Sequence, residues 1–223
     1  GFLTGRIFSV YRIIGFYDDA FDSSDEDTEG RDLHSVQCFD LSTNSWHLLP
    51  SMPTKREDYT VSVLEGQLYV VGGFNDDGYL SCVERFNPGT GSWQVLPQMH
   101  NKKFDYSASV LGGQLYIVGG RIGHTQTVLF NDVERFDPAT NHWQVLPPIS
   151  RARFRHSAIV IAGQLYILGG SSVQERRHHP QADKFKSLKS VERFTPCTNT
   201  WEELSEMSIE SMQVCALPGR SYI

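Results

Sequence analysis

The feature that most constrains the fold of this 223-residue chain is a short sequence that occurs three times. Each copy reads Gln-Leu-Tyr, two aliphatic residues and Gly-Gly, at 67–73, 114–120 and 164–170. Val-Glu-Arg-Phe follows each copy, and a tryptophan stands seven residues after its phenylalanine. Phe39 and Trp46 add a fourth such step, so the tryptophans recur at intervals of 47, 50 and 58 residues. Repetition at this period predicts a series of similar supersecondary units.

Each complete repeat predicts four short strands, because β-branched and aromatic residues gather in runs between turn residues. The first strand is expected at 59–64, 106–111 and 156–161. A glycine-containing pair then links it to the Leu-Tyr strand, since glycine supplies the positive φ of a tight hairpin. Val-Glu-Arg-Phe is expected as the third strand, and the tryptophan begins the fourth after a proline-containing turn. Because no segment shows sustained helical periodicity, the sequence predicts an all-β fold.

A double glycine on the second of four strands, with a fixed Phe-to-Trp step on the next two, resembles the Kelch-repeat family of β-propellers. The period is similar to the roughly 50 residues of a Kelch repeat, rather than the roughly 40–45 of WD40. The Trp-Asp dipeptide of WD40 is also absent. The resemblance implies a single Kelch-repeat domain over residues 1–223, with repeats at about 6–52, 53–99, 100–149 and 150–207 and a partial repeat at 208–223.

The pattern is interrupted at both ends of the chain. Phe16 follows Gly15 where the other repeats have a second glycine, and 212–223 resembles a first strand with half of a second. We therefore expect a Kelch β-propeller with three complete four-stranded blades and partial blades at both ends. Such an arrangement is an incomplete ring or a fragment of a six-bladed propeller, and we hypothesise a fragment or splice form of a longer protein. Open blade edges would favour self-association.

Charge and cysteine usage exclude several classes of protein. The formal charge of -6 is concentrated at 18–32, which carries -7, so the remainder is nearly neutral. Binding to nucleic acid or to an anionic membrane is therefore not expected. No apolar run approaches the roughly 20 residues that span a bilayer. The four cysteines form neither a disulfide framework nor a zinc ribbon, which predicts a reduced, cytoplasmic protein.

Candidate catalytic and metal-binding residues have simpler structural interpretations. His178, His179 and Cys197 lack the spacing of a metal site, so a solvated loop is expected there. The double glycines end strands without a following helix, which indicates close packing rather than phosphate binding. One glutamate recurs in every complete repeat, and a residue needed by every blade is interpreted as structural: Glu84, Glu134 and Glu192. We expect no enzyme activity, no metal and no cofactor.

The loops after the double glycines vary, and repeat proteins vary the loops that meet partners. They hold nine residues at 74–82, twelve at 121–132 and twenty at 171–190. The first repeat has instead the acidic loop 17–35, for which disorder is expected and whose Ser23 and Ser24 resemble an acidic-directed kinase site. The basic 171–190 loop is either a solvated loop or a contact for an acidic peptide.

Among Kelch proteins, the chain most resembles the Kelch domain of Kelch-like (BTB-Kelch) substrate adaptors of cullin-RING ubiquitin ligases. In those adaptors a partner peptide binds at one mouth of the propeller, through residues just before the first strand and just after the double glycine. The resemblance places framework basic residues at Arg56, Lys103 and Arg153. The partner-binding positions that it implies, with two arginines of the basic loop, are Asp58, Phe74, Asp105, Arg121, Arg155, Ser171, Arg176 and Arg177.

Three functions follow from this reading. The first is a protein-binding module, the substrate-recognition part of a cullin-RING ligase adaptor, whose cullin would be engaged by segments not in this sequence. The second is a Kelch protein that binds actin or the cytoskeleton. The third, from another class, is a Kelch-propeller enzyme that acts on sugars, resembling sugar oxidases or sialic-acid epimerases. Because the implied mouth mixes acids with an arginine, the uniformly basic pocket suited to an acidic peptide is not predicted.

Overall fold

The computed structural model describes residues 9–13, 34–123, 127–173 and 185–210. Within these ranges all regular structure is β, as predicted, and every strand pairing is antiparallel. Because the described residues contain no helix, they include none that could cross a membrane. Three parts of the predicted segments lie outside the described residues: 211–223 of the partial repeat at 208–223, 17–33 of the acidic loop and 174–184 of the basic loop.

Three sheets of four strands correspond to the three complete repeats, and we call them blades 2, 3 and 4. Blade 2 comprises β4 (Thr60–Leu64), β5 (Gln67–Val71), β8 (Val83–Asn87) and β9 (Ser92–Leu96). Blade 3 comprises β10 (Ser107–Leu111), β11 (Gln114–Val118), β14 (Val133–Asp137) and β15 (His142–Leu146). Blade 4 comprises β16 (Ser157–Ile161), β17 (Gln164–Leu168), β20 (Val191–Thr195) and β21 (Thr200–Leu204). The four predicted strands of each repeat are confirmed.

The first repeat forms a sheet of three strands, which we call blade 1. It comprises β1 (Ser9–Ile13), β2 (Val36–Asp40) and β3 (Ser45–Leu49). These strands correspond to the second, third and fourth strands of the other blades, since Phe39 pairs with Trp46 across β2 and β3. Residues 1–8, which precede β1 along the chain, lie outside the described residues.

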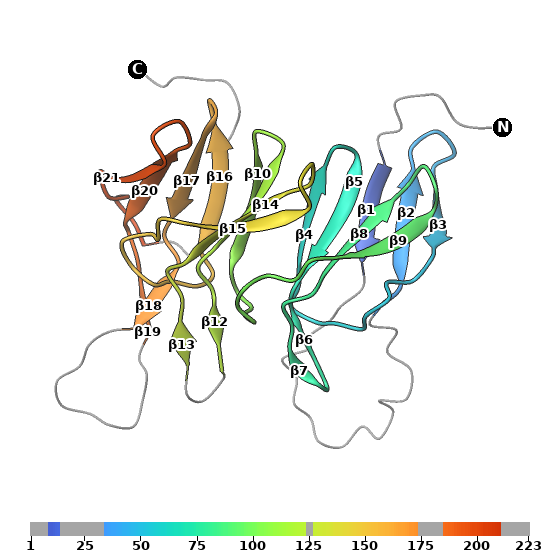
Figure 1. Cartoon of the computed structure of the whole chain (residues 1–223), viewed down its shortest axis with the longest axis horizontal. Coiled ribbons are helices and arrows are strands. Elements are labelled where there is room, and N and C mark those ends of the chain that lie inside the picture. Colours follow the sequence, from blue (N-terminus) through green and yellow to red (C-terminus); the bar gives the residue numbers. More distant parts are fainter. Residues whose placement is uncertain (1–8, 14–33, 124–126, 174–184, 211–223) are drawn as a thin grey trace.

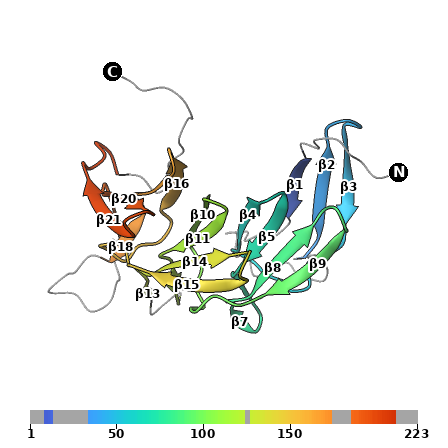
Figure 2. The ribbon, with the colours of Figure 1, turned by 45° about the horizontal axis from the view of Figure 1, so that its top comes forward.

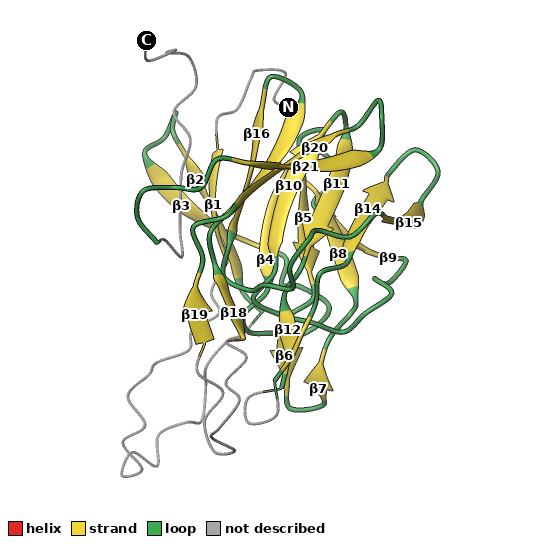
Figure 3. Ribbon diagram, turned by 90° about the vertical axis from the view of Figure 1, so that its left-hand side faces the viewer, coloured by secondary structure: helices red, strands yellow, loops and turns green. Residues whose placement is uncertain are grey.

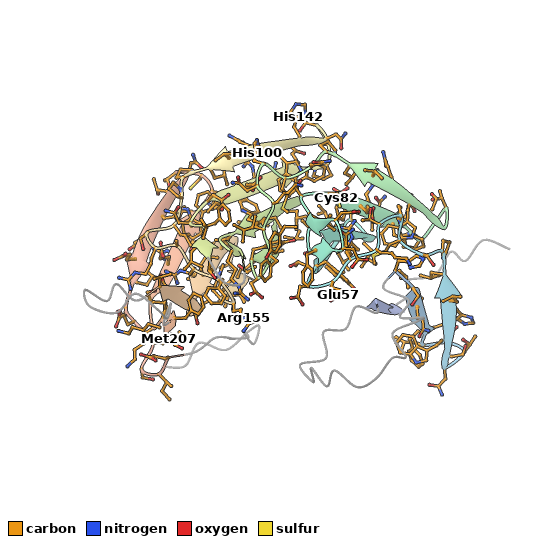
Figure 4. All side chains as sticks on the ribbon, turned by 90° about the horizontal axis from the view of Figure 1, so that it is seen from below. Glu57, Cys82, His100, His142, Arg155 and Met207 are labelled. Atoms are coloured by element: carbon orange, nitrogen blue, oxygen red, sulfur yellow. The ribbon has the colours of Figure 1, made fainter. Side chains whose placement is uncertain are left out.

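The blades stand side by side in an open arc (Figure 1; Figure 4). The first strands of the complete blades lie on the concave side, where β10 packs between β4 and β16. The view in Figure 2 shows the blades fanned about this inner edge, with the last strands β9, β15 and β21 toward the outside. The arc is the expected incomplete propeller, with three complete blades and one partial blade among the described residues.

A short hairpin follows the double glycine in each complete blade. The three hairpins are β6 (Phe74–Asn75) with β7 (Gly78–Tyr79), β12 (Arg121–Ile122) with β13 (Val128–Leu129), and β18 (Ser171–Val173) with β19 (Phe185–Ser187). The sequence predicted plain loops here, because strands of two or three residues are too short to show a periodic pattern. All three hairpins extend from the same end of the blades (Figure 3).

The second glycine of each pair lets the segment that leads into the first strand of the same blade approach its backbone. Gly120 has a φ of +101°, and a Cβ there would lie 2.8 Å from the carbonyl oxygen of Phe104. Gly73 is placed alike, with a Cβ 2.3 Å from the carbonyl oxygen of Glu57. Only glycine satisfies both the backbone conformation and the space, which supports the packing role expected for these residues.

Apolar side chains fill the joints between blades. Leu64 and Tyr69 of blade 2 pack with Ile117 and Phe136 of blade 3, and an equivalent cluster joins blade 3 to blade 4. Blade 4 has no following blade among the described residues. Its Ile161 stands where Leu64 and Leu111 stand in blades 2 and 3, yet it is 45% exposed whereas they are 3% and 7% exposed. Among the described residues, no blade covers this last face of the arc.

Candidate protein-binding mouth

The end of the arc that carries the hairpins has a repeated buried framework. We call this end the mouth: it consists of the three hairpins and the segments that lead into the first strands, 55–59, 102–106 and 152–156. In each lead-in segment a fully buried cation pairs with the recurring glutamate of the third strand. The distances are 2.9 Å for Arg56 and Glu84, 3.1 Å for Lys103 and Glu134, and 2.5 Å for Arg153 and Glu192.

These cations also fasten the lead-in segments to the glycines. Arg56 Nη1 donates to the Gly72 carbonyl oxygen at 3.0 Å, and Arg153 Nη1 donates to that of Gly169 at 3.1 Å. A buried charge requires compensating partners, and here a carboxylate lies within 3.1 Å of each cation. The basic residue expected by resemblance and the recurring glutamate are therefore two halves of one structural ion pair.

Blade 3 replaces the arginine with Lys103 and recruits further partners. Lys103 Nζ lies 2.8 Å from Asp132 Oδ1 as well as 3.1 Å from Glu134. The His100 backbone N–H donates to Glu134 at 2.7 Å, and the His100 ring nitrogen Nδ1 lies 2.9 Å from the same oxygen. Burial alone would raise the pKa of Glu134, but the charge of Lys103 and the His100 hydrogen bonds hold that pKa below its usual 4.5. Glu134 is thus an ionised structural group.

The predicted partner-binding positions before the first strands share an unusual backbone conformation. Asp58, Asp105 and Arg155 have φ values of 47°, 55° and 53°. The left-handed region is uncommon for residues other than glycine and is kept where surrounding structure enforces it. Here the preceding residue of each pairs with a hairpin: Glu57 with Phe74, Phe104 with Arg121, and Phe154 with Ser171. Asp58 and Arg155 are exposed and Asp105 is half-buried.

Asp105 brings two predicted positions of neighbouring blades together. Arg121 Nε donates to Asp105 Oδ2 at 2.6 Å, and Arg155 Nε donates to Asp105 Oδ1 at 3.3 Å. The Arg121 side chain is 11% exposed, whereas that of Arg155 is 53% exposed. Arg121 is consequently held inside the mouth, and Arg155 is the arginine of this pair that solvent and a partner can reach.

Arg121 also lies within a row of aromatic rings that crosses the mouth. Its guanidinium carbon is 4.6 Å from the ring centre of Phe104 and 4.8 Å from that of Phe154. Phe104 stacks on Tyr79 at 5.3 Å, and Phe154 meets Phe185 edge-on at 4.8 Å. A guanidinium between two ring faces gains cation–π attraction, which is stronger where water is excluded. We call Tyr79, Phe104, Arg121, Phe154 and Phe185 the aromatic row.

The other predicted positions lie in different surroundings. Phe74 is half-buried against Tyr79 and Phe104. Ser171 is 2% exposed, and its backbone pairs with that of Phe154. Arg176 and Arg177 fall outside the described residues. The structure thus unites Asp105, Arg121 and Arg155, keeps Asp58 exposed on blade 2, and leaves Ser171 little access to a partner.

The aromatic members of the row were not predicted from the sequence. Phe104 and Phe154 each follow a framework cation directly, which was an available signal. Glu57 occupies that position in blade 2, so the pattern is broken in one repeat of three. Tyr79 and Phe185 lie in the variable loops, where the repeat offers no register.

The described residues contain no preformed metal-binding site. In 34–123, 127–173 and 185–210, no three His, Cys, Asp or Glu side chains gather closely enough to hold a metal ion. A cavity of about 420 Å³ lies beside blade 4, and its charged lining residues have both signs, among them Arg151, Lys189, Glu203 and Glu206. The recurring glutamates face buried cations rather than a cavity, so they are not placed to act as general acids or bases.

Sequence comparisons match Kelch proteins over parts of the chain. The mouse protein named Influenza virus NS1A-binding protein homolog is 49% identical over 53 residues, which are 22% of this chain and 8% of that protein. Mouse Kelch-like protein 8 is 33% identical over 55 residues, or 25% of this chain and 9% of that protein. The matched segment is thus less than a tenth of either relative's length.

Comparison with solved structures supports the fold. The structure of YjhT superposes with a TM-score of 0.63 over 78% of this chain and 60% of that one, at 17% sequence identity. At this identity the similarity concerns the fold alone.

Family models agree with the repeats read from the sequence. The model for the KLHDC2/KLHL20/DRC7 Kelch-repeats domain matches residues 25–170, which is more than half of the chain. The Kelch motif matches residues 152–208, which include blade 4. With four-stranded blades arranged as a propeller arc and a double glycine in each complete one, the chain belongs to the Kelch-repeat family.

Proposed function

We propose that the chain is a protein-binding module, and that it is the substrate-recognition part of a Kelch-like adaptor of a cytoplasmic cullin-RING ubiquitin ligase. One observation supports the protein-binding role: the mouth keeps its buried framework constant and varies the charge of the positions beside it. The framework ion pair recurs in all three complete blades. The positions two residues beyond the framework cations are Asp58, Asp105 and Arg155, which differ in charge.

Such a division of roles suits recognition better than catalysis. A repeat scaffold holds its loops rigidly, and changes in the loops change the partner without loss of the fold. The relatives support the proposal, since they include a Kelch-like protein and a protein named for binding influenza virus NS1A. The adaptor role itself rests on resemblance to Kelch-like proteins.

Proximity labelling with the full-length gene product tests the proposal in cells. Three proteins would be compared: the unchanged sequence, Arg155→Glu in the mouth, and Glu65→Lys as a control. Glu65 is exposed in the turn between β4 and β5, at the opposite end of the blades, and its substitution changes the charge by the same magnitude with the opposite sign. Circular dichroism and thermal unfolding of the purified chains would confirm equal folding.

The expected result is labelling of a cullin together with at least one further protein that is lost in Arg155→Glu and kept in Glu65→Lys. Recovery of actin without a cullin would replace the adaptor role with the cytoskeletal one. An identical set of labelled proteins for all three sequences would refute binding at the mouth. Turnover of free sugars by the purified chain would favour the enzyme alternative instead.

A further inference from the structure

The exposed charges of the mouth change sign along the arc. On blade 2 the exposed ionisable residues of the lead-in segment and hairpin are Lys55 and three carboxylates, Asp58, Asp76 and Asp77. On blade 4 the corresponding described residues are the cations Arg155 and Lys186. Figure 4, which looks onto the mouth, shows Glu57 of blade 2 and Arg155 of blade 4 on the concave side of the arc.

Blade 3 separates these two ends with charges that are mostly neutralised. The Arg121 charge is bound by Asp105 at 2.6 Å and enclosed between Phe104 and Phe154. Lys103 is fully buried, with two carboxylates as partners. Lys102 is exposed in this lead-in segment. An acidic end and a basic end are therefore joined through a middle section of rings and closed ion pairs.

Both charged ends are anchored on the same aromatic row. Asp76 and Asp77 lie at the tip of the β6–β7 hairpin, whose Tyr79 stacks on Phe104. Lys186 lies on β19, next to Phe185, whose ring meets Phe154. Arg121 then connects Phe104 to Phe154. Because the row links both hairpins, it fixes the two ends relative to each other before a partner arrives, which reduces the entropy lost on binding.

On the basis of the proposed protein-binding function, we propose that the mouth recognises a polypeptide segment in which a basic block and an acidic block stand side by side. The basic block lies against Asp76 and Asp77 of blade 2, and the acidic block against Arg155 and Lys186 of blade 4. Complementary charges accelerate encounter and fix the register of a partner. A segment of one sign is repelled at one end, so the arrangement discriminates against uniformly acidic or basic partners.

The experiment uses four synthetic peptides and the full chain. The probes are a lysine block and a glutamate block joined by a glycine spacer, a peptide with the same residues in alternation, an all-lysine peptide and an all-glutamate peptide. Binding would be measured by fluorescence anisotropy at low and at high salt. The protein variants are D76K/D77K, R155E/K186E, the combination of both pairs, and Glu65→Lys as the control distant from the mouth.

The block peptide is expected to bind about tenfold or more tightly than the alternating one, with the difference reduced by salt. Either double substitution should weaken its binding, and Glu65→Lys should not. The combined variant should bind it again, since exchanging both signs restores complementarity to a peptide laid in the opposite direction. A loss caused merely by altered folding would not be rescued in this way.

Two results would overturn the inference. Equal binding of the all-glutamate and block peptides would show a basic site, which leaves the proposed protein-binding function intact. Equal binding of the block and alternating peptides, or binding of neither, would refute the proposal that the partner carries a basic block beside an acidic block. The proposed function is decided separately, by whether labelled proteins depend on Arg155 in the full-length gene product.

Discussion

The indole N–H of Trp143 in blade 3 donates a hydrogen bond of 2.8 Å to the carbonyl oxygen of Pro97, which follows the last strand of blade 2. Trp93 makes the same bond to Pro50 at 2.8 Å, and Trp201 makes it to Pro147 at 2.9 Å. In every case the tryptophan also lies across the sheet from the phenylalanine seven residues before it. The fixed Phe-to-Trp step thus places a side chain that ties each blade to the preceding one.

Trp143→Phe should lower the free energy of unfolding by about 1 kcal/mol, because it removes this hydrogen bond but keeps an aromatic ring. Trp46→Phe is the matched control. Trp46 contacts Phe39 as Trp143 contacts Phe136, but it is 49% exposed and makes no such bond to a described residue. Urea unfolding, monitored by circular dichroism, measures the free energy of unfolding of both variants. Equal losses for the two variants would contradict a joining role for Trp143.

Glu134→Gln should destabilise the chain by about 1–3 kcal/mol, since it removes one of the two carboxylates that pair with the buried Lys103 and leaves Asp132 as the other. Lys103→Met/Glu134→Met is the informative comparison. Removing both buried charges leaves no buried cation short of a partner, and Asp132 is partly exposed, so the double variant is expected to be more stable than Glu134→Gln. Chemical unfolding of the unchanged chain, the single variant and the double variant measures their relative stabilities. A double variant that is less stable than the single one would show that the ion pair itself stabilises the fold.

His156 should make stability depend on pH between about 7.5 and 5.5. Burial, followed by the charge of Arg153, lowers the pKa of His156 to about 3, whereas the unfolded chain has a value near 6.5. The unfolded state therefore binds the proton first, and stability is complete above pH 6.5 and lost as the pH falls below it. The expected loss is about 1 kcal/mol between these pH values.

His156→Tyr is the control for this dependence. Tyr106 occupies the same place in blade 3 and donates a hydrogen bond of 2.5 Å to the Val71 carbonyl oxygen. A tyrosine at 156 does not ionise in this range, so the pH dependence of the urea midpoint should become flatter. An unchanged slope would show that other groups cause it.

Gly120→Ala should cost far more stability than Gly113→Ala. Both glycines have positive φ, +101° and +75°, so both substitutions bear a backbone penalty of about 1 kcal/mol. A Cβ at Gly113 meets only Glu65 Oε1, at 4.0 Å, whereas one at Gly120 lies 2.9 Å from the Cβ of Tyr106. Thermal unfolding of both variants would separate the backbone penalty, which they share, from the cost of the steric overlap at Gly120. Similar melting temperatures would mean that the segment before β10 can move away from Gly120 at little cost.

The sequence predicted the strands of the complete blades closely, because each repeat supplies an independent copy of the same pattern. The expected first strand at 106–111 forms at Ser107–Leu111, and the glutamates interpreted as structural are buried in ion pairs. The strands and ion pairs depend on contacts between residues of the same blade. Because these contacts are repeated in every complete blade, the repeated sequence predicts them.

The mouth could be predicted only in part, because its contacts join different blades. Arg121 was expected to meet a partner, yet Phe154 and Asp105 enclose most of it. Asp105 and Arg155 are fifty residues apart, and nothing in either repeat signals that one carboxylate is shared between two blades. A side-chain pair that occurs in one place only does not appear in the repeat pattern of the sequence, so that pattern cannot predict it.

The uncovered last face, where Ile161 is 45% exposed, makes the arc unequal in its resistance to local opening. Blade 3 is buried against a neighbour on both sides, whereas blade 4 has this support on one side among the described residues. In a linear array, each blade's stability is its own plus that of the joints it shares. Amide hydrogens of β10 and β11 should therefore exchange through near-global unfolding, and those of β16 and β17 through a smaller opening at the end of the row.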